Sequence, residues 1–94
     1  MSYIITEKAR KDLDDIWYYI AKDKILAANK VEDDILEALD LIVETPSIGT
    51  KKHDLLDMPV RFWVVHNYYI IYNPNTRPLQ ILRIISSYRD IEKF

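Results

Sequence analysis

The chain has 94 residues, of which 49% are hydrophobic and 30% are charged, and it contains one Gly, four Pro and no Cys. This length and composition predict one globular domain and exclude a disordered segment, a disulfide scaffold and any site built on thiolates. The net charge is −2, but residues 1–45 hold six Lys or Arg against eleven Asp or Glu, whereas residues 46–94 hold seven against four. This asymmetry is too weak to predict general nucleic-acid binding.

Targeting and metal-binding signals are missing from the sequence. The N-terminal stretch MSYIITEKAR lacks the basic region and apolar run of a secretory signal, and no apolar stretch approaches the length of a bilayer crossing. The lack of such an apolar stretch predicts no membrane contact, and the lack of any Cys favours the reducing cytoplasm. The two His residues lie thirteen positions apart in different predicted elements. This spacing matches no metal site, and we predict neither a metal nor another cofactor.

Two amphipathic helices are predicted in the first half of the chain. A short strand is predicted over residues 2–5, and Thr6 has a suitable side chain for the N-cap of the helix that follows. The apolar stripe of this first helix consists of Ala9, Leu13, Ile16 and Ile20. The stripe of the second helix, which should end before Pro46, consists of Ala28, Val31, Ile35, Leu39 and Ile42. We predict that the two helices form an antiparallel hairpin.

Three aromatic residues in a row, Trp17, Tyr18 and Tyr19, fall in the first predicted helix. At about 100° per residue, Trp17 flanks the apolar stripe, Tyr18 points away from it and Tyr19 lies on the opposite flank. Tyr adds contact area at low entropic cost, so Tyr18 is a candidate for binding a partner. Exposed aromatic residues also occur without a partner, and that alternative stays open.

The second half of the chain predicts a sheet. Enrichment in Val, Ile, Tyr, Phe and Trp predicts three strands, at residues 60–65, 68–72 and 79–85. A tight turn at His66-Asn67 and a Pro-Asn turn at residues 73–78 would join them.

These elements together predict an α+β fold. We expect an N-terminal strand at one edge, an antiparallel helix hairpin packed on an antiparallel sheet of about four strands, and a short C-terminal helix. Ser86 or Ser87 is a candidate cap for that last helix, over residues 89–94.

Both faces of the predicted sheet are apolar. Phe62 and Val64 alternate with Trp63 and Val65, and in the last strand Ile81 and Ile85 alternate with Leu82 and Ile84. Two helices can cover only one face, so the terminal segment, a second copy or a partner chain must cover the other. We favour a partner chain, with a self-covered small core as the alternative. The predicted partner-binding residues are Tyr18, Trp63, Val65, Leu82 and Ile84.

The order of these elements resembles the ParE branch of the RelE/ParE toxin superfamily over nearly the whole chain. The stretches that carry the resemblance are TEKARKDL, WYYI, YYIIY and ILRIISSYRDI. The resemblance implies the toxin of a bacterial type II toxin–antitoxin pair, which inhibits DNA gyrase and is neutralised by a cognate ParD-like antitoxin. It further implies a protein that is not an enzyme and that binds no nucleic acid sequence-specifically.

RelE-like members of the superfamily instead cut mRNA in the ribosome, which requires a base, an acid and cations around the phosphate. With YYIIY aligned to that branch, the expected Lys positions are Val60 and Phe62, and the expected Arg is Tyr69. Of the cations only Arg89 clearly remains, and Phe94 lies near the place of a terminal Tyr. A ribosome-dependent mRNA endonuclease with Arg89 as its catalytic residue is therefore the alternative. A third reading is a non-toxic antitoxin-binding or regulatory module.

The candidate target-binding residues are mainly cations of the second half. Arg83 alternates with Ile81 and Ile85, where a charge needs either a groove or an ion-pair partner such as Asp90. The predicted target-binding residues are Arg61, Arg83, Tyr88 and Arg89.

Overall fold

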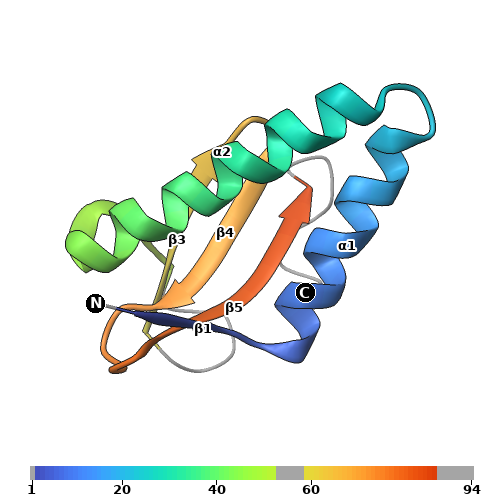
Figure 1. Cartoon of the computed structure of the whole chain (residues 1–94). Coiled ribbons are helices and arrows are strands. Elements are labelled where there is room, and N and C mark those ends of the chain that lie inside the picture. Colours follow the sequence, from blue (N-terminus) through green and yellow to red (C-terminus); the bar gives the residue numbers. More distant parts are fainter. Residues whose placement is uncertain (1, 53–58, 87–94) are drawn as a thin grey trace.

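Two helices lie on one face of a five-stranded sheet in the computed structural model, which describes residues 2–52 and 59–86 (Figure 1). In chain order the elements are β1 (Tyr3–Ile5), α1 (Glu7–Ala21), α2 (Ile25–Glu44), the 3₁₀ turn η1 (Pro46–Ile48), β2 (Thr50–Lys52), β3 (Val60–Val65), β4 (Tyr68–Asn73) and β5 (Leu79–Ser86). The predicted α+β class, the helix hairpin and the first strand at one edge are confirmed. The predicted C-terminal helix lies outside the described residues.

The sheet differs from the prediction in two respects. Its strand order is β1-β5-β4-β3-β2, so there are five strands rather than about four. The extra strand, β2, was not among the predicted strands because the sequence Thr-Lys-Lys has no apolar alternation. It forms by antiparallel pairing along the edge of β3. The sheet is also mixed rather than antiparallel, since β1 runs parallel to β5, with Tyr3 opposite Leu79.

Thr6 ties the start of α1 to the sheet. Its hydroxyl accepts a hydrogen bond from the backbone N–H of Ala9 at 3.2 Å, which confirms the predicted N-cap. The same hydroxyl donates to the carbonyl of Leu82 at 3.1 Å, and the Thr6 backbone N–H donates to the carbonyl of Ile81 at 3.1 Å. The chain therefore continues along the edge of β5 where β1 ends, and α1 leaves from that edge.

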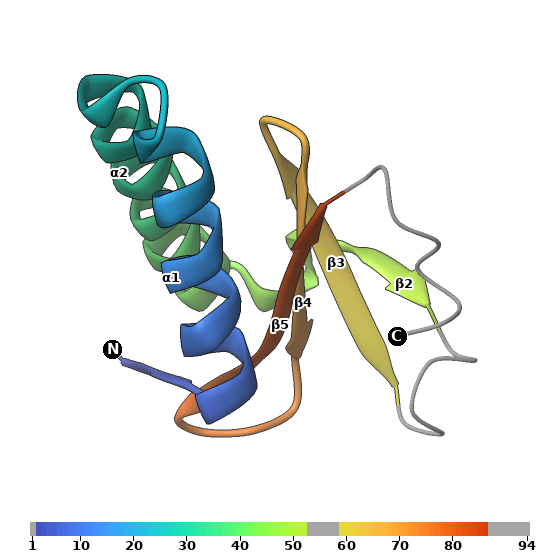
Figure 2. The same cartoon turned by 90° about the vertical axis from the view of Figure 1, so that its right-hand side faces the viewer.

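The predicted helical stripes form the core between the hairpin and the sheet. Ala9 and Leu13 of α1 are buried, as are Ala28, Ile35, Leu39 and Ile42 of α2. The remaining stripe residues, Ile16, Ile20 and Val31, are half-buried. Both helices cover the same face of the sheet (Figure 2).

The prediction that both faces of the sheet are apolar is confirmed. The helix-covered face belongs to the main core, and the other face carries a second apolar cluster. This second cluster consists of Val60, Ile71 and Ile85, which are buried, and Phe62, Tyr69 and Leu82, which pack against them.

The predicted alternation of β5 is wrong in its middle. Tyr72 pairs with Ile81, but Ile71 pairs with Arg83, so Leu82 is an extra residue in the ladder. As a result Ile81 and Ile84 both belong to the helix-covered core, whereas Leu82 packs in the second cluster. A bulge of this kind reverses the facing of every residue after it, which period-two reasoning does not anticipate.

The turn between β3 and β4 is the predicted two-residue turn at His66-Asn67. His66 adopts a positive φ of 53°, which suits a tight hairpin turn, and its Nε2 lies 2.7 Å from Oδ2 of Asp34 on α2. Hydrogen bonds from Lys30 and from His66 lower the pKa of the Asp34 carboxyl. This contact fixes the turn between β3 and β4 against α2.

Candidate functional site

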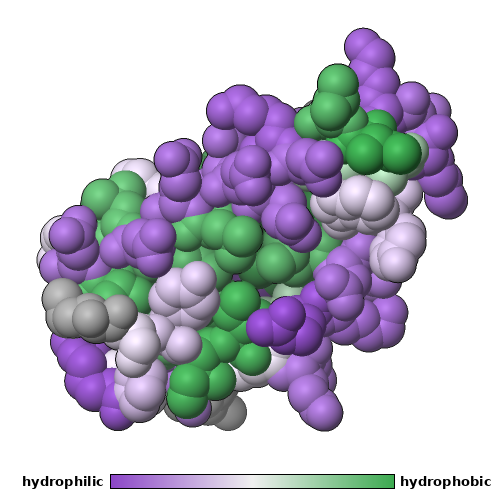
Figure 3. Space-filling view, viewed as in Figure 1, coloured by the Kyte–Doolittle hydropathy of each residue, from purple (hydrophilic) through white to green (hydrophobic). Residues whose placement is uncertain are grey.

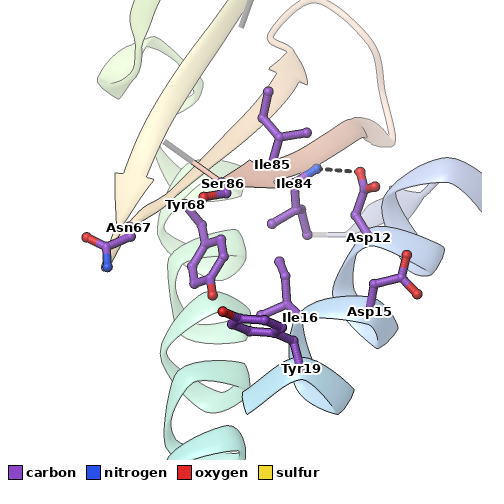
Figure 4. A pocket seen from close by; sticks show the side chains of 9 residues that line it. All are labelled: Asp12, Asp15, Ile16, Tyr19, Asn67, Tyr68, Ile84, Ile85 and Ser86. Atoms are coloured by element: carbon purple, nitrogen blue, oxygen red, sulfur yellow. Dashed lines mark hydrogen bonds between the residues drawn. The ribbon is translucent and has the colours of Figure 1, made fainter. Parts of the chain in front are cut away.

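A groove of about 590 Å³ lies between α1 and the adjoining ends of β4 and β5, and we call it the α1–β5 groove (Figure 4). Its lining residues are Asp12, Asp15, Ile16, Tyr19, Asn67, Tyr68, Ile84, Ile85 and Ser86. In the close-up view the Tyr19 ring, from the helix, and the Tyr68 ring, from the sheet, point toward one another across it. The groove thus combines apolar walls, two phenols and carboxylates at its helix side.

Asp12 joins the two walls of the groove. Its carboxylate accepts from Nε of Arg83 at 2.7 Å, from Nη2 at 3.0 Å and from the backbone N–H of Ile84 at 2.9 Å. The Asp12 and Arg83 side chains are only 13% and 24% exposed. A bidentate pair of this kind is stronger than a surface ion pair, and its hydrogen bond raises the pKa of Arg83. Asp12 therefore holds α1 against β5 and satisfies a backbone donor on the strand.

Asp12 was missed as a site residue, although the sequence contains a signal for it. It lies three residues after Ala9 and four before Ile16, so it shares their side of the helix. Asp15 differs, because its carboxylate pairs with Lys11 at 2.9 Å and both side chains are exposed. Asp12 and Asp15 are therefore close in sequence but have different environments.

Arg83 forms an ion pair within the fold. The predicted pairing alternative named Asp90, but the described partner is Asp12, on an element 71 residues away in sequence. Arg61, by contrast, donates from Nη1 to the carbonyl of Gly49 at 2.6 Å and is half-buried. Tyr88 and Arg89, the other two predicted target-binding residues, lie outside the described residues.

The predicted partner-binding residues are distributed over several parts of the fold. Trp63 and Val65 are half-buried and pack against the helix-covered core, and Ile84 is buried there at 1% exposure. Leu82 packs in the second cluster instead. Tyr18 is 67% exposed near the end of α1 and stacks edge-to-face on Trp17 at 5.3 Å. Their binding role stays a prediction.

The tip of the helix hairpin carries an exposed apolar surface that the sequence reasoning did not identify. Tyr19 is 72% exposed, and Leu26, in the first turn of α2, is 82% exposed next to Ile25. The space-filling view shows this apolar patch at the end where α1 passes into α2 (Figure 3). Leu26 lies next to Ile25 and off the predicted stripe, which is the signal that could have indicated it.

The positions where the mRNA-cutting branch carries cations form part of an apolar layer here. Val60 is 2% exposed in the second cluster, where Phe62 and Tyr69 stack edge-to-face at 5.2 Å. The cations of the longer strands β3 and β5, Arg61 and Arg83, bind groups on η1–β2 and on α1 respectively. The described residues therefore bring no cluster of cations to this face.

Neither helix of the described ranges has the combination of length and apolarity that a membrane crossing requires.

Residues 3–91 match the model of a protein family described as the ParE toxin of the type II toxin–antitoxin system parDE. A search of curated proteins gave no match. Among solved structures, the chain is similar to one described as the chromosomal ParDE TA system from P. aeruginosa. The two are 26% identical, with a TM-score of 0.73, and the similarity covers 92% of this chain and 95% of that one.

The fold and the family match define the class of this protein as a toxin of a type II toxin–antitoxin system. Within that class, the chain belongs to the ParE toxin family.

Proposed function

We propose that this chain inhibits DNA gyrase by binding it, without a chemical step of its own, and that a cognate ParD-like antitoxin neutralises it. The observation that carries the proposal is the apolar packing of Val60, Phe62 and Tyr69. Cleavage of RNA would need cations and a proton acceptor around the phosphate, and an apolar cluster supplies neither. Family membership supports the choice of gyrase over the ribosome.

A growth and activity assay tests this function. The chain is induced alone in bacteria, and the purified protein is assayed for gyrase supercoiling and for ribosome-dependent mRNA cleavage. We expect growth arrest and gyrase inhibition without cleavage. Site-specific cleavage that disappears in Arg89→Ala would show an endonuclease instead. A chain that binds an antitoxin but never arrests growth would be a regulatory module.

We further propose that the antitoxin binds along α1, over the α1–β5 groove and the tip of the helix hairpin. The supporting observations are the exposed Tyr18 and Tyr19 and the apolar patch around Leu26. Exposed apolar area next to polar side chains is typical of protein-binding surfaces. An exposed apolar surface of this kind fits the apolar face of an amphipathic antitoxin segment.

Alanine variants test this surface. The proposed ParD-like antitoxin is titrated against the wild type, Tyr19→Ala and Tyr18→Ala. Leu41→Ala is the matched control, because Leu41 is an exposed apolar residue of α2 outside the groove and the tip. We expect the Tyr variants to weaken binding by about tenfold or more. An equal loss in Leu41→Ala would place the antitoxin elsewhere.

A further inference from the structure

A second pocket, of about 460 Å³, lies at the end of the sheet where β3 begins and β4 ends. Three of its lining residues are cations: Lys51 of β2, Arg61 of β3 and Arg77 of the turn between β4 and β5. Ser47 and Asn75 add a hydroxyl and an amide, and no Asp or Glu is among its described lining residues. We call it the basic pocket.

Within residues 2–52 and 59–86, the cations of the basic pocket have no acidic partner. Among the described residues, neither Lys51, Arg61 nor Arg77 forms an ion pair, whereas Arg83 does. The register of β2 on β3 places Lys51 directly opposite Arg61. Like charges directly opposite one another across two strands are destabilising, so the fold brings these two cations together against their mutual repulsion. An anion between them would remove that repulsion.

The two guanidinium groups are anchored in a way that leaves donors available. Arg61 donates from Nη1 to the carbonyl of Gly49, and Arg77 donates from Nη1 to the carbonyls of Pro74 and Thr76 at 3.0 and 2.7 Å. A guanidinium has five N–H donors, and the described hydrogen bonds use only Nη1 of each residue. The Nε and Nη2 donors remain for a ligand in a preformed arrangement, which lowers the entropy lost on binding.

The loop that carries Arg77 is also held in place. The side-chain oxygen of Asn73 accepts a hydrogen bond from the backbone N–H of Asn75 at 3.0 Å. The hydroxyl of Thr76 accepts one from the backbone N–H of Gln80 at 3.0 Å. Arg77 therefore lies on a turn whose backbone is fixed at both sides.

We propose that the basic pocket binds a phosphate group. Two guanidinium groups and one ammonium match the charge and the acceptor oxygens of a phosphate better than those of a single carboxylate. The phosphate can belong to a small molecule or to the backbone of a nucleic acid, where the contact carries no sequence information. This inference goes beyond the proposed function and does not rest on it.

A titration of the full chain with inorganic phosphate tests the proposal. The backbone amide signals of Gly49, Arg61 and Asn75 are followed by NMR. We expect saturable shifts at these positions. The double variant Lys51→Gln/Arg77→Gln should weaken binding by about tenfold or more, because two charge-assisted contacts are lost. Absence of saturable shifts would overturn the proposal.

The matched control is Lys8→Gln/Lys22→Gln, which removes the same charge at two exposed positions outside the pocket. It should bind phosphate as the wild type does, and an equal loss in both double variants would also overturn the proposal. The single variant Lys51→Gln is a second test, because Lys51 is exposed and its side chain makes no described hydrogen bond. Thermal unfolding of each variant verifies that it is folded.

Two further titrations identify the source of the phosphate. A nucleoside monophosphate that binds while a twelve-base-pair DNA duplex does not would indicate a small-molecule ligand. Duplex binding that falls in the pocket variant and with added salt would indicate a nucleic-acid backbone. A glutamate-rich peptide that binds more tightly than both would overturn the phosphate assignment. Because the titrations need neither gyrase nor growth, failure of the proposed function and failure of this inference are separable.

Discussion

Arg83 and Arg61 are strand cations in one sheet, but their surroundings give them opposite roles. Arg83 makes a bidentate ion pair with Asp12, which uses its charge to hold α1 on the edge of β5. Among the described residues Arg61 binds only the carbonyl oxygen of Gly49 and lies opposite Lys51, so no described acid compensates its charge. A cation that is neutralised by its own fold supports structure, whereas a cation without an acid is available to a ligand.

The largest expected effect tests the Arg83 side of this comparison. Asp12→Ala leaves Arg83 without Asp12 and leaves the N–H of Ile84 without its acceptor. We expect a loss of about 2–4 kcal/mol in the free energy of unfolding, measured with urea. Asp15→Ala is the control, because it removes only an exposed pair with Lys11 and should cost less than about 1 kcal/mol. Equal losses would remove the structural role assigned to Asp12.

A smaller effect on the free energy of unfolding is expected from Gly49→Ala, at the residue whose carbonyl binds Arg61. A Cβ at Gly49 would lie 2.6 Å from the hydroxyl of Tyr72 and 2.8 Å from the carbonyl oxygen of Phe62. Overpacking of this kind costs about 1–3 kcal/mol, again measured by urea unfolding. Ser47→Ala, at an exposed position of η1, should change the free energy of unfolding little. If Gly49→Ala were as stable as the wild type, the tight contact with Tyr72 would not exist in solution.

A pH-dependent effect concerns Tyr72, which links the sheet to η1. Its hydroxyl donates to the carbonyl of Pro46 at 2.6 Å and accepts from the N–H of Gly49 at 2.9 Å. Burial raises the pKa of this phenol, so the folded state keeps the proton to higher pH than the unfolded state does. The associated stability is fully present below the unfolded pKa, about 10, and is lost as pH rises through the folded pKa.

The measurement for Tyr72 is the difference in unfolding free energy between the wild type and Tyr72→Phe as a function of pH. We expect the wild type to be more stable at pH 8 and this advantage to shrink above about pH 10. Other Tyr and Lys residues titrate in both proteins and cancel in the difference. A constant advantage up to pH 12 would contradict the burial of the phenol.

The smallest expected effect distinguishes the two cation environments most directly. Lys51→Gln removes a charge that has only like charge opposite it, so the free energy of unfolding should change by no more than about 0.5 kcal/mol. Any change should be toward higher stability, and it should fade with added salt. A clear loss of stability would show that Lys51 has an acidic partner, and the basic pocket would then be compensated.

Several elements followed from local sequence patterns. The strand limits at residues 60–65 are as predicted, and the predicted third strand at residues 79–85 is extended by one residue in β5. The Thr6 cap and the two helical stripes are confirmed as well. These features depend on residues within one or two turns of one another, or on a simple period, so the sequence carries them directly.

The candidate site was less accessible to sequence reasoning. The apolar character of Val60, Phe62 and Tyr69 was visible in the sequence, and so was the exposure of Tyr18. The α1–β5 groove was not, because it depends on how Tyr19 and Tyr68 from distant elements come together. The basic pocket was missed for the same reason, since β2 was not among the predicted strands.

By itself, the sequence determined the α+β class, the helix hairpin, the three main strands and the resemblance to ParE toxins. Only the tertiary structure decided that β1 pairs parallel to β5, that Leu82 is an extra residue in its ladder, and that Asp12 neutralises Arg83. The physical reason is the separation along the chain of the residues that interact. Periodicity and capping are local, whereas the β1–β5 pairing and the Asp12–Arg83 pair join residues more than 70 positions apart in the chain. The bulge at Leu82 depends on how β5 pairs with the separate strand β4.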